Sequence, residues 1–329
     1  MSIAIVGAGS WGTTLAILAS QNTDVVLYTR DEVRANDMQL SRRNAKYLNE
    51  IELPNNISIT ANQDNVRDAQ QVIFAVPSIG FRDAIVQFSF LDPSIPYISV
   101  TKGLEKTTNM RMSQVIQDAD PRKKLENIAV LGGPNLAHEI ANSFPAATVV
   151  ASQSKELASN VQSLLMTNLF RVYVSSDVIG CEIGGVAKNV VAIAVGIGDG
   201  LQFGDNAKAA VMTRALAEIT RLGVSQGGIA STFSGLAGVG DLIATCASSL
   251  SRNRTVGFLL GQGKTLAEIE QTTHEIAEGV FSASSLNKIA LQAEVEMPIV
   301  SAVTKVIESG SVSKKDVETL MTRPASTEF

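Results

Sequence analysis

Residues 2–12, SIAIVGAGSWG, decide the fold of the amino-terminal half of the chain. A short apolar run with a strand pattern leads into G-x-G-x-x-G, and a helical pattern follows directly. Gly7 permits the tight turn, Gly9 lets the backbone approach a pyrophosphate, and Gly12 allows the helix to pack closely on the strand. The free N–H groups and the dipole at the start of the helix favour phosphates. A second predicted strand, Val25–Tyr28, follows at the expected distance, so this segment predicts a dinucleotide-binding βαβ unit.

The residue that ends the second strand bears on the choice of dinucleotide. An NAD-specific fold usually has an acid there for the ribose hydroxyls, whereas this chain has Arg30 followed by Asp31. An arginine at this position can accept the 2′-phosphate of NADP, and a solvent-facing arginine without a ligand is an equally good interpretation. Strict NAD specificity is therefore not predicted.

Predicted strands and helices alternate as far as residue 175. Further strands are predicted at 57–60, 72–76, 96–100, 128–131, 146–151 and 170–175, and helices between them at 34–47 and 156–166. In a doubly wound sheet the ligand lies beyond the carboxyl ends of the strands. Lys102 and Gly133 follow two of these ends, so both are candidate ligand contacts, although a loop lysine is more often only solvated.

After residues 176–180 only helical patterns remain. They follow the helix that contains Lys188 and are predicted at 207–222, 252–260, 266–271, 280–293, 299–308 and 314–321. The predicted fold class is therefore α/β. A Rossmann-like, doubly wound dinucleotide-binding domain is expected at 1–178, and an all-α substrate-binding and catalytic domain at 179–329.

Two charged residues stand in apolar surroundings in the second half. Lys188, followed by Asn189, lies in the first turns of an almost wholly apolar predicted helix. A buried ammonium must face a polar cleft, find an acid or lose its proton. A lysine that reaches solvent from a helix end is the simpler explanation, but the Gly-Gly before it and the apolar run after it argue against that. Asp241, in GVGDL, is either a helix N-cap or the partner of a buried cation.

Three further polar sites have both a structural and a functional interpretation. SRNR at 251–254 offers a hydroxyl, a guanidinium and an amide at one helix start, which suits a phosphate dianion. Capping by Ser251 with two surface arginines would explain the same pattern. Glu278 opens a helix, where a capping acid is the simplest interpretation. His138 is a possible acid–base group, but a histidine near a helix start is more often structural.

Composition limits the function further. The chain has 329 residues, 45% hydrophobic and 18% charged, with a formal net charge of -5, so it reads as a globular protein and not as a general nucleic-acid binder. Two cysteines and two histidines make neither a disulfide framework nor a histidine-based metal cluster, and no metal is expected. No signal peptide is recognised before SIAIV, and the apolar run around Lys188 is too short and too polar at its start to span a bilayer. The cytoplasm is the expected compartment, with no membrane insertion.

The motifs together resemble the bacterial NAD(P)-dependent glycerol-3-phosphate dehydrogenases, over almost the whole chain and in the family's order. The matching segments are GAGSWGT at 7–13, TKGLE at 101–105, GGPN-LAHE at 132–139, GGVAKN at 184–189, GDGLQFGDNAKAA at 198–210, GLAGVGDLIATC at 235–246 and SRNR at 251–254. The resemblance implies reversible hydride transfer from NAD(P)H to dihydroxyacetone phosphate, giving sn-glycerol 3-phosphate for glycerophospholipid synthesis. It also implies a homodimer and a carboxy-terminal domain like that of 6-phosphogluconate dehydrogenase.

The resemblance also assigns roles to residues. Catalytic roles fall on Lys188, Asp241 and Lys102. Cofactor contacts fall on Gly7, Gly9, Ser10, Trp11, Gly12, Arg30, Lys102, Gly133, Ala137, Arg252, Ile276 and Glu278. Substrate contacts fall on Lys102, Gly133, Asn135, Lys188, Asn189, Asp241, Thr245, Ser251, Arg252 and Asn253. The implied hypothesis is that Lys188 exchanges the proton, Asp241 holds its charge and orientation, and Lys102 stabilises the oxyanion.

The chain departs from the family pattern at three places. The family commonly has serine in place of Asn135, lysine or arginine in place of His138, and Tyr-Leu-Pro-Gly in place of YLNE at 47–50. These positions lie at the cofactor loop or away from the chemistry, so they bear on cofactor details. Two rival hypotheses remain: a reductase for another acid or alcohol, which would not need SRNR, and a dinucleotide-sensing regulator, which would need a DNA-binding motif that the sequence does not show.

Overall fold

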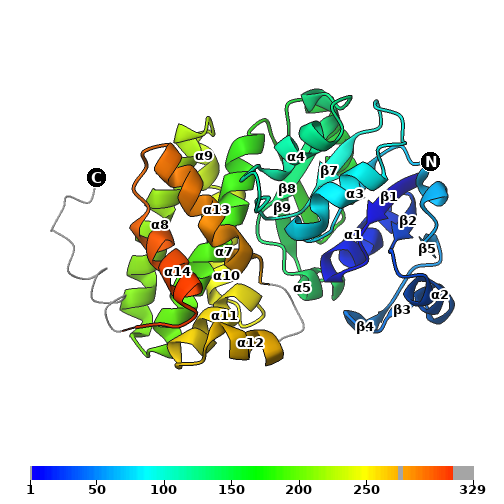
Figure 1. Cartoon of the computed structure of the whole chain (residues 1–329). Coiled ribbons are helices and arrows are strands. Elements are labelled where there is room, and N and C mark those ends of the chain that lie inside the picture. The colour runs from blue at the N-terminus through cyan, green and yellow to red at the C-terminus, as the bar shows by residue number, and fades with distance from the viewer. Residues whose placement is uncertain (1, 273–276, 314–329) are drawn as a thin grey trace.

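The amino-terminal half is built on one twisted sheet in the computed structural model, which describes residues 2–272 and 277–313 (Figure 1). The 8-stranded sheet has the order β10-β9-β8-β7-β6-β1-β2-β5, and neighbouring strands are parallel except for β8 and β9. The strands are β1 Ser2–Val6, β2 Asp24–Tyr28, β5 Ile57–Thr60, β6 Val72–Phe74, β7 Tyr97–Ser99, β8 Ile128–Gly132, β9 Ala146–Ser152 and β10 Phe170–Ser175. Every predicted strand is present, and the doubly wound fold class is confirmed.

Helices cover both faces of this sheet because side chains alternate along each strand. In β1, Ile3 and Ile5 join one core cluster with residues of α1, α2 and α6, while Ala4 and Val6 join another with residues of α3 and α4. The helices of this half are α1 Ser10–Ser20, α2 Glu32–Ser41, α3 Phe81–Gln87, α4 Met112–Ala119, α5 Ala137–Ala141 and α6 Lys155–Leu165. The short helices α3 and α4 were not predicted.

Strand order reverses between β1 and β6, which both pair with parallel neighbours. The crevice beyond the carboxyl ends of these two strands is where doubly wound sheets bind ligands. The glycine-rich loop leaves β1 at this point. Gly7 has φ +110°, and a Cβ there would lie 2.5 Å from the carbonyl oxygen of Ala75, so the sharp turn requires glycine.

The predicted helix at 34–47 is wrong in its second half. Helix α2 ends at Ser41 because Arg42 adopts a left-handed conformation, with φ 53° and ψ 33°. The chain then forms a small antiparallel hairpin of β3 Arg43–Asn44 and β4 Leu48–Glu52, separate from the main sheet. The polar sequence of this segment carries no periodicity that distinguishes a helix from a hairpin.

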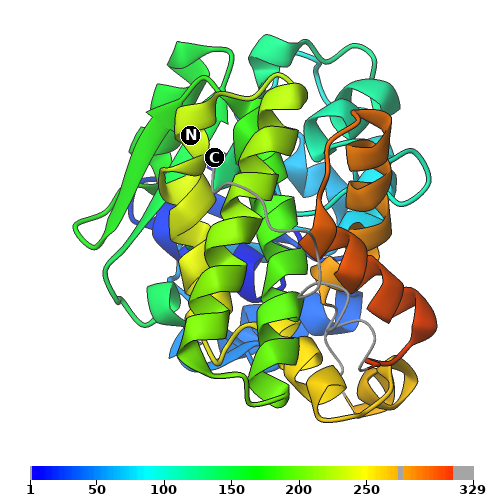
Figure 2. The ribbon, with the colours of Figure 1, turned by 90° about the vertical axis from the view of Figure 1, so that its left-hand side faces the viewer.

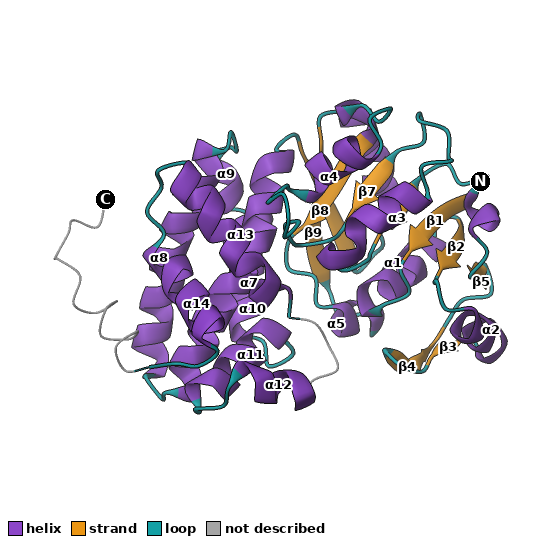
Figure 3. Cartoon of the chain, viewed as in Figure 1, coloured by secondary structure: helices purple, strands orange, loops and turns teal. Residues whose placement is uncertain are grey.

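The carboxy-terminal half is all helical (Figure 3). Seen from the helical end in Figure 2, its helices lie in front of the sheet and around α7. They are α7 Val178–Gly200, α8 Gly204–Ser225, α9 Ala230–Phe233, a π-helical segment Leu236–Gly240, α10 Asp241–Ala247, α11 Arg252–Gly261, α12 Leu266–Thr272, α13 Glu278–Gln292 and α14 Pro298–Ser309. The helix predicted at 314–321 lies outside the described residues.

Helix α7 is the core of this half. It packs against α8, α10, α11, α13 and α14. The expectation that the apolar run around Lys188 is too short and too polar to span a bilayer is wrong, because α7 has 23 residues and, within the described ranges, is alone long and apolar enough by itself to cross a membrane. Ala230–Ala247 with Arg252–Gly261 would pass the same test only as one bent pair. The apolar window of α7 is 78% buried inside the protein, as the central helix of a globular domain must be.

Glycines bring α7 and α11 into backbone contact. A Cβ at Gly257 would lie 2.1 Å from the carbonyl oxygen of Ile193, and one at Gly196 would lie 2.1 Å from that of Arg254. No side chain fits between the two helices there. This close approach sets the start of α11, with its SRNR segment, beside the middle of α7.

We predict that Gly257→Ala destabilises the protein by about 1–3 kcal/mol, because the added methyl group overpacks the contact between α7 and α11. At an exposed helical position the same change would stabilise by about 1 kcal/mol. Thermal or urea unfolding measures the difference. Thr255→Ala, at an exposed position of α11, is the matched control and should stay within about 0.5 kcal/mol of wild type. A more stable Gly257→Ala variant would contradict the close contact.

Candidate active site

The carboxylate of Asp241 lies at the centre of the site and binds two lysines. Its Oδ1 accepts a hydrogen bond from Nζ of Lys188 at 2.7 Å, and its Oδ2 accepts one from Nζ of Lys102 at 2.6 Å. Lys188 also donates to the hydroxyl of Thr245 at 2.7 Å, and that hydroxyl donates to the Asp241 carbonyl at 2.7 Å. The side chains are 1% exposed for Asp241, 10% for Lys188 and 16% for Lys102. The three charged groups therefore form one buried cluster.

Small residues allow these groups to meet. The π-helical segment before α10 runs against α7, since a Cβ at Gly184 would lie 2.5 Å from the carbonyl oxygen of Ala237. Asp241 begins α10 immediately after this segment. Lys188 lies in the middle of α7 and not in its first turns as predicted, because the helix begins at Val178 with Asp177 as its cap. Its ammonium therefore cannot reach solvent from a helix end.

Lys102 comes to this cluster from the other half of the chain. It follows β7, and its ammonium also donates to the carbonyl oxygen of Gly133, beyond β8, at 2.7 Å. Burial lowers the pKa of Lys102 to about 8, with Asp241 opposing the shift and the charge of Lys188 adding to it. Two cations on one carboxylate leave an excess of positive charge, which favours an anion or a developing oxyanion.

A chain of amide contacts extends from Lys102 into the helical half. Asn189 Nδ2 donates to the Lys102 carbonyl at 3.4 Å, Asn253 Nδ2 donates to Asn189 Oδ1 at 3.0 Å, and the N–H of Gly279 donates to Asn253 Oδ1 at 2.9 Å. Asn253 lies in the first turn of α11, beside the exposed Arg252. This network places the predicted phosphate-binding segment against the lysine cluster.

The other members of SRNR have structural contacts. Ser251 caps α11, since its hydroxyl accepts from the N–H of Arg254 at 3.3 Å. Arg254 binds Asp199 of α7 at 2.8 Å through Nε and at 2.6 Å through Nη2. Ser251 therefore has the capping role that one of the two interpretations of the sequence gave it. Arg254 holds α11 against α7 through its ion pair with Asp199.

Glu278 connects the two halves and does not cap its own helix. Its carboxylate accepts hydrogen bonds from the N–H of Ser78 at 3.0 Å and from the Ser78 hydroxyl at 2.5 Å. Ser78 follows β6, beside the crevice in the sheet. Gly103 leaves room for the contact, because a Cβ there would lie 2.5 Å from that of Ser78. Burial raises the pKa of Glu278, while the Ser78 hydrogen bonds and the charge of Arg252 oppose the rise.

The glycine-rich loop fits a dinucleotide. A Cβ at Gly9 would meet nothing within 4 Å, whereas one at Gly12 would lie 1.9 Å from the Gly7 carbonyl oxygen. Gly12 is thus required by packing, but Gly9 faces open space that a ligand can enter. No side chain caps α1 at Gly9, so the first N–H groups of the helix are available to a phosphate.

The remaining predicted cofactor residues lie around this loop or outside the described part. Ser10 and Trp11 form the first turn of α1, and Arg30 is exposed beyond the end of β2. Ala137 begins α5 beside α1, and its carbonyl accepts a hydrogen bond from the Thr14 hydroxyl at 3.1 Å. Ile276 lies outside the described residues.

Comparison with known proteins decides the family. Residues 2–158 match the model described as NAD-dependent glycerol-3-phosphate dehydrogenase N-terminus, and residues 177–318 match the corresponding C-terminus. The chain is 44% identical over 332 residues to a glycerol-3-phosphate dehydrogenase (NAD(P)+) of Corynebacterium kroppenstedtii, covering 100% of both chains. It is 44% identical over 328 residues to that of Streptomyces coelicolor, covering 99% of this chain and 97% of the relative.

This chain belongs to the NAD-dependent glycerol-3-phosphate dehydrogenase family. The crystal structure of a glycerol-3-phosphate dehydrogenase from Coxiella burnetii superimposes with a TM-score of 0.92 at 33% identity, covering 98% of this chain and 99% of that one. The Saccharomyces cerevisiae structure, at 24% identity and a TM-score of 0.83, shares the fold over 98% of this chain and 99% of its own. The resemblance predicted from the motifs is confirmed.

Two of the departures from the family pattern have distinct surroundings. Asn135 Nδ2 donates to the Thr148 hydroxyl at 3.0 Å, while its buried Oδ1 has no hydrogen-bond partner in the part of the chain that the structure describes. An unpartnered buried acceptor beside Gly133 is available to a ligand that carries a donor. His138 is exposed on α5, so the structure does not bring it into the lysine cluster.

Several groups around the dehydrogenase site were missed by sequence reasoning. Glu182 of α7 accepts hydrogen bonds from the N–H of Ser113 at 2.8 Å and its hydroxyl at 2.6 Å, and also binds Arg111. Ser78 makes the corresponding contact with Glu278 described above. These pairs are far apart in the sequence, and nothing local distinguishes them from surface residues.

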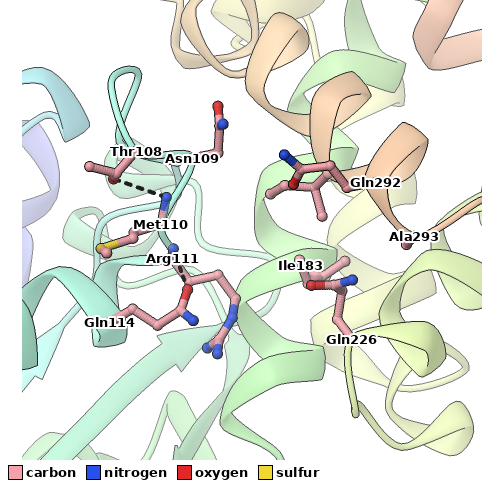
Figure 4. A pocket seen from close by; sticks show the side chains of 10 residues that line it. Thr108, Asn109, Met110, Arg111, Gln114, Ile183, Gln226, Gln292 and Ala293 are labelled. Carbon is pink, nitrogen blue, oxygen red and sulfur yellow. Dashed lines mark hydrogen bonds between the residues drawn. The ribbon is translucent and has the colours of Figure 1, made fainter.

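A separate cavity of about 260 Å³ opens between the two halves (Figure 4). Side chains of the Thr108–Gln114 segment face Ile183, Gln226 and Gln292 across it. It contains neither the lysine cluster nor the glycine-rich loop. The residues predicted to be catalytic, Lys188, Asp241 and Lys102, therefore do not line this cavity.

We predict that Lys102 titrates with a midpoint of about 8 in the folded protein, because burial beside Lys188 disfavours its charged form. Carbon-13 NMR of lysine labelled at Cε measures the midpoint, and Lys102→Arg assigns the resonance. The reference is the lysine side chain in a model peptide, whose pKa is roughly 10.4. A Lys102 midpoint at that value would contradict the packed cluster.

Proposed function

We propose that this chain reduces dihydroxyacetone phosphate to sn-glycerol 3-phosphate with NAD(P)H, reversibly, with Lys188 as the acid–base group. The observation that carries the proposal is the pair of lysines on the single carboxylate of Asp241, at the carboxyl edge of a dinucleotide-binding sheet. Full-length similarity to proteins named for this reaction supports the substrate. When bound, the reduced nicotinamide supplies the hydride.

Lys188 is proposed to protonate the oxygen that becomes the secondary hydroxyl, and to take that proton back in the reverse direction. Its contacts with Asp241 and Thr245, both at 2.7 Å, fix the direction of the ammonium. The Asp241 carboxylate balances the positive charge of the lysine cluster before and after Lys188 transfers its proton. Among the described residues no histidine contacts Lys188 or Asp241, so the lysine is the proposed proton donor of this cluster.

Lys102 is proposed to stabilise the oxyanion as the ketone is reduced. A charged donor held in a site with little water stabilises developing negative charge more strongly than the same group in solution. The Gly133 carbonyl and Asp241 position this ammonium. Asn135, whose Oδ1 lacks a partner, is proposed to accept a hydrogen bond from a substrate hydroxyl.

The start of α11 is proposed to bind the substrate phosphate. Ser251 is the N-cap and Arg252 and Asn253 lie in the first turn, where the helix dipole and free N–H groups also favour an anion. Asn189 links this turn to the lysine cluster through Asn253. Arg252 and Glu278 are also proposed to contact the dinucleotide, with Arg30 at its adenosine end.

The family resemblance supports three broader proposals. Residues 1–178 are assigned as the dinucleotide-binding domain and 179–329 as the catalytic domain. The product is proposed to serve glycerophospholipid synthesis in the cytoplasm, without membrane insertion, because α7 is covered by the chain itself. The protein is proposed to be a homodimer, which its mass in solution would decide.

The reaction is tested directly by the absorbance of the reduced nicotinamide in the presence of dihydroxyacetone phosphate. Wild type should oxidise NADH or NADPH, and Lys188→Ala should lower kcat by about 10²–10⁴-fold, the usual contribution of a general acid. Calorimetry should show that the variant still binds cofactor. Tight cofactor binding by wild type without any oxidation would instead support a dinucleotide sensor.

We predict that Arg252→Ala raises the KM for dihydroxyacetone phosphate roughly 10- to 100-fold, since it removes a charge-assisted hydrogen bond to the phosphate. Unphosphorylated dihydroxyacetone is the matched control substrate. At saturating cofactor its kcat/KM, which we expect to be low in wild type, should change little in the variant. An equal loss with both substrates would show that Arg252 does not bind the phosphate.

A further inference from the structure

Two side chains from outside the G-x-G-x-x-G motif bind the carbonyl group of Ala8, which lies inside the glycine-rich loop. Asn44 Nδ2 donates to this oxygen at 3.0 Å, and Nη2 of Arg34 also donates to it. Arg34 lies on α2, and Asn44 lies on β3 of the small hairpin. Both contacts join segments that the dinucleotide motif does not include.

The two holding side chains are themselves fixed. Asn44 is 0% exposed; its amide also donates to the Thr13 hydroxyl at 2.7 Å, and its Oδ1 accepts from Arg34 Nη2 at 3.2 Å. The guanidinium of Arg34 lies over the Tyr47 ring, 4.9 Å from its centroid. All of the hydrogen-bonding groups of the Asn44 side chain are thus engaged around one loop carbonyl.

The direction of this carbonyl determines the direction of the next N–H. The peptide unit is planar, and in its trans form the C=O and the following N–H point in opposite directions. When the Ala8 carbonyl points towards Arg34 and Asn44, the N–H of Gly9 points away from them. Gly9 is the position at which a Cβ would meet nothing within 4 Å.

We propose that Arg34 and Asn44 are positioning residues for dinucleotide binding: they hold the Ala8 carbonyl and thereby aim the Gly9 N–H at the pyrophosphate. We call these two contacts with the Ala8 carbonyl the Ala8 clamp. Helix α2 carries Arg34, and the hairpin at residues 43–52 carries Asn44. A guanidinium beside the loop also adds positive charge close to an anionic ligand. This inference rests on the dinucleotide of the proposed function, but not on its substrate or reaction.

If Arg34 and Asn44 served only to attach the hairpin to α1, a charged side chain at this buried place would be hard to explain. Nε of Arg34 is buried without a hydrogen-bond partner among residues 2–272 and 277–313, and burying an incompletely paired guanidinium is costly. A plain apolar contact would attach the hairpin to α1 without that cost. A preorganised loop instead lowers the cost of ordering on binding, which gives the charged pair a function.

The test is calorimetric titration with NADH and with ADP-ribose, which carries the same pyrophosphate without nicotinamide. Asn44→Ala and Arg34→Met should raise Kd for both ligands roughly tenfold, the effect of one lost hydrogen bond to a charged group or its support. Arg34→Lys, which keeps a donor and the charge, should recover part of the loss. At saturating cofactor, kcat should stay within about twofold of wild type, as expected when only uniform binding is lost.

Gln39→Ala is the matched control variant. Gln39 also lies on α2. Its Oε1 accepts hydrogen bonds from the N–H of Ile59 at 2.8 Å and from Arg42 Nη1 at 3.3 Å, so this change removes contacts of α2 with the sheet and with the base of the hairpin, and leaves both contacts with the Ala8 carbonyl in place. Its Kd for NADH should equal that of wild type. Wild-type Kd values in Asn44→Ala and Arg34→Met, or an equal rise in Gln39→Ala, would overturn the proposal. Because binding is measured without turnover, failure of the proposed reaction would not affect this result.

Discussion

One buried carboxylate, shared by two ammonium groups, is the interaction on which the rest of the structure depends. Asp241 contributes one oxygen to Lys188 and the other to Lys102, so a residue of the helical half is bound to a loop of the sheet half. Removing one partner of such a buried group leaves an uncompensated charge, which commonly costs about 3–5 kcal/mol. The cluster therefore cannot be rearranged one residue at a time. It also carries a net positive charge at the place where a ketone oxygen would become negative.

The remaining contacts between the halves support this cluster. Glu278 binds Ser78 beside the crevice of the sheet, Glu182 binds Ser113, and Asn189 donates to the Lys102 carbonyl. Backbone contact between α7 and α11, permitted by Gly196 and Gly257, sets the spacing between Lys188 and the proposed phosphate-binding turn. The arrangement of the lysine cluster thus follows from the packing of α7. The glycine-rich loop, which belongs to the sheet half, forms the proposed cofactor side of the site and does not depend on α7.

The parts of the fold and of the candidate site that depend on residues close together in the sequence could be predicted from the sequence. The GAGSWG segment predicts its own turn, because each glycine has a backbone reason to be there. The apolar run around Lys188 predicts a buried lysine that must face a polar cleft, find an acid or lose its proton, and the structure supplies the acid. Asp241 was predicted only as one of two alternatives, since a capping acid and a buried counter-ion look alike before packing is known. The first part of the hairpin, residues 43–47, was predicted as the end of a helix, because its polar sequence has no periodicity that marks a strand. The Ala8 clamp could not be predicted, since it joins residues through tertiary contact alone.

The most direct test of the account is a double-mutant cycle on kcat with Lys188→Met and Asp241→Leu, in protein whose fold is checked by circular dichroism. Since the two groups are proposed to act as one unit, each single change should lower kcat by about 10²–10⁴-fold. The double variant should be no worse than the more damaged single one. Losses that multiply would show that Lys188 and Asp241 act independently, and would contradict the shared carboxylate as the basis of catalysis.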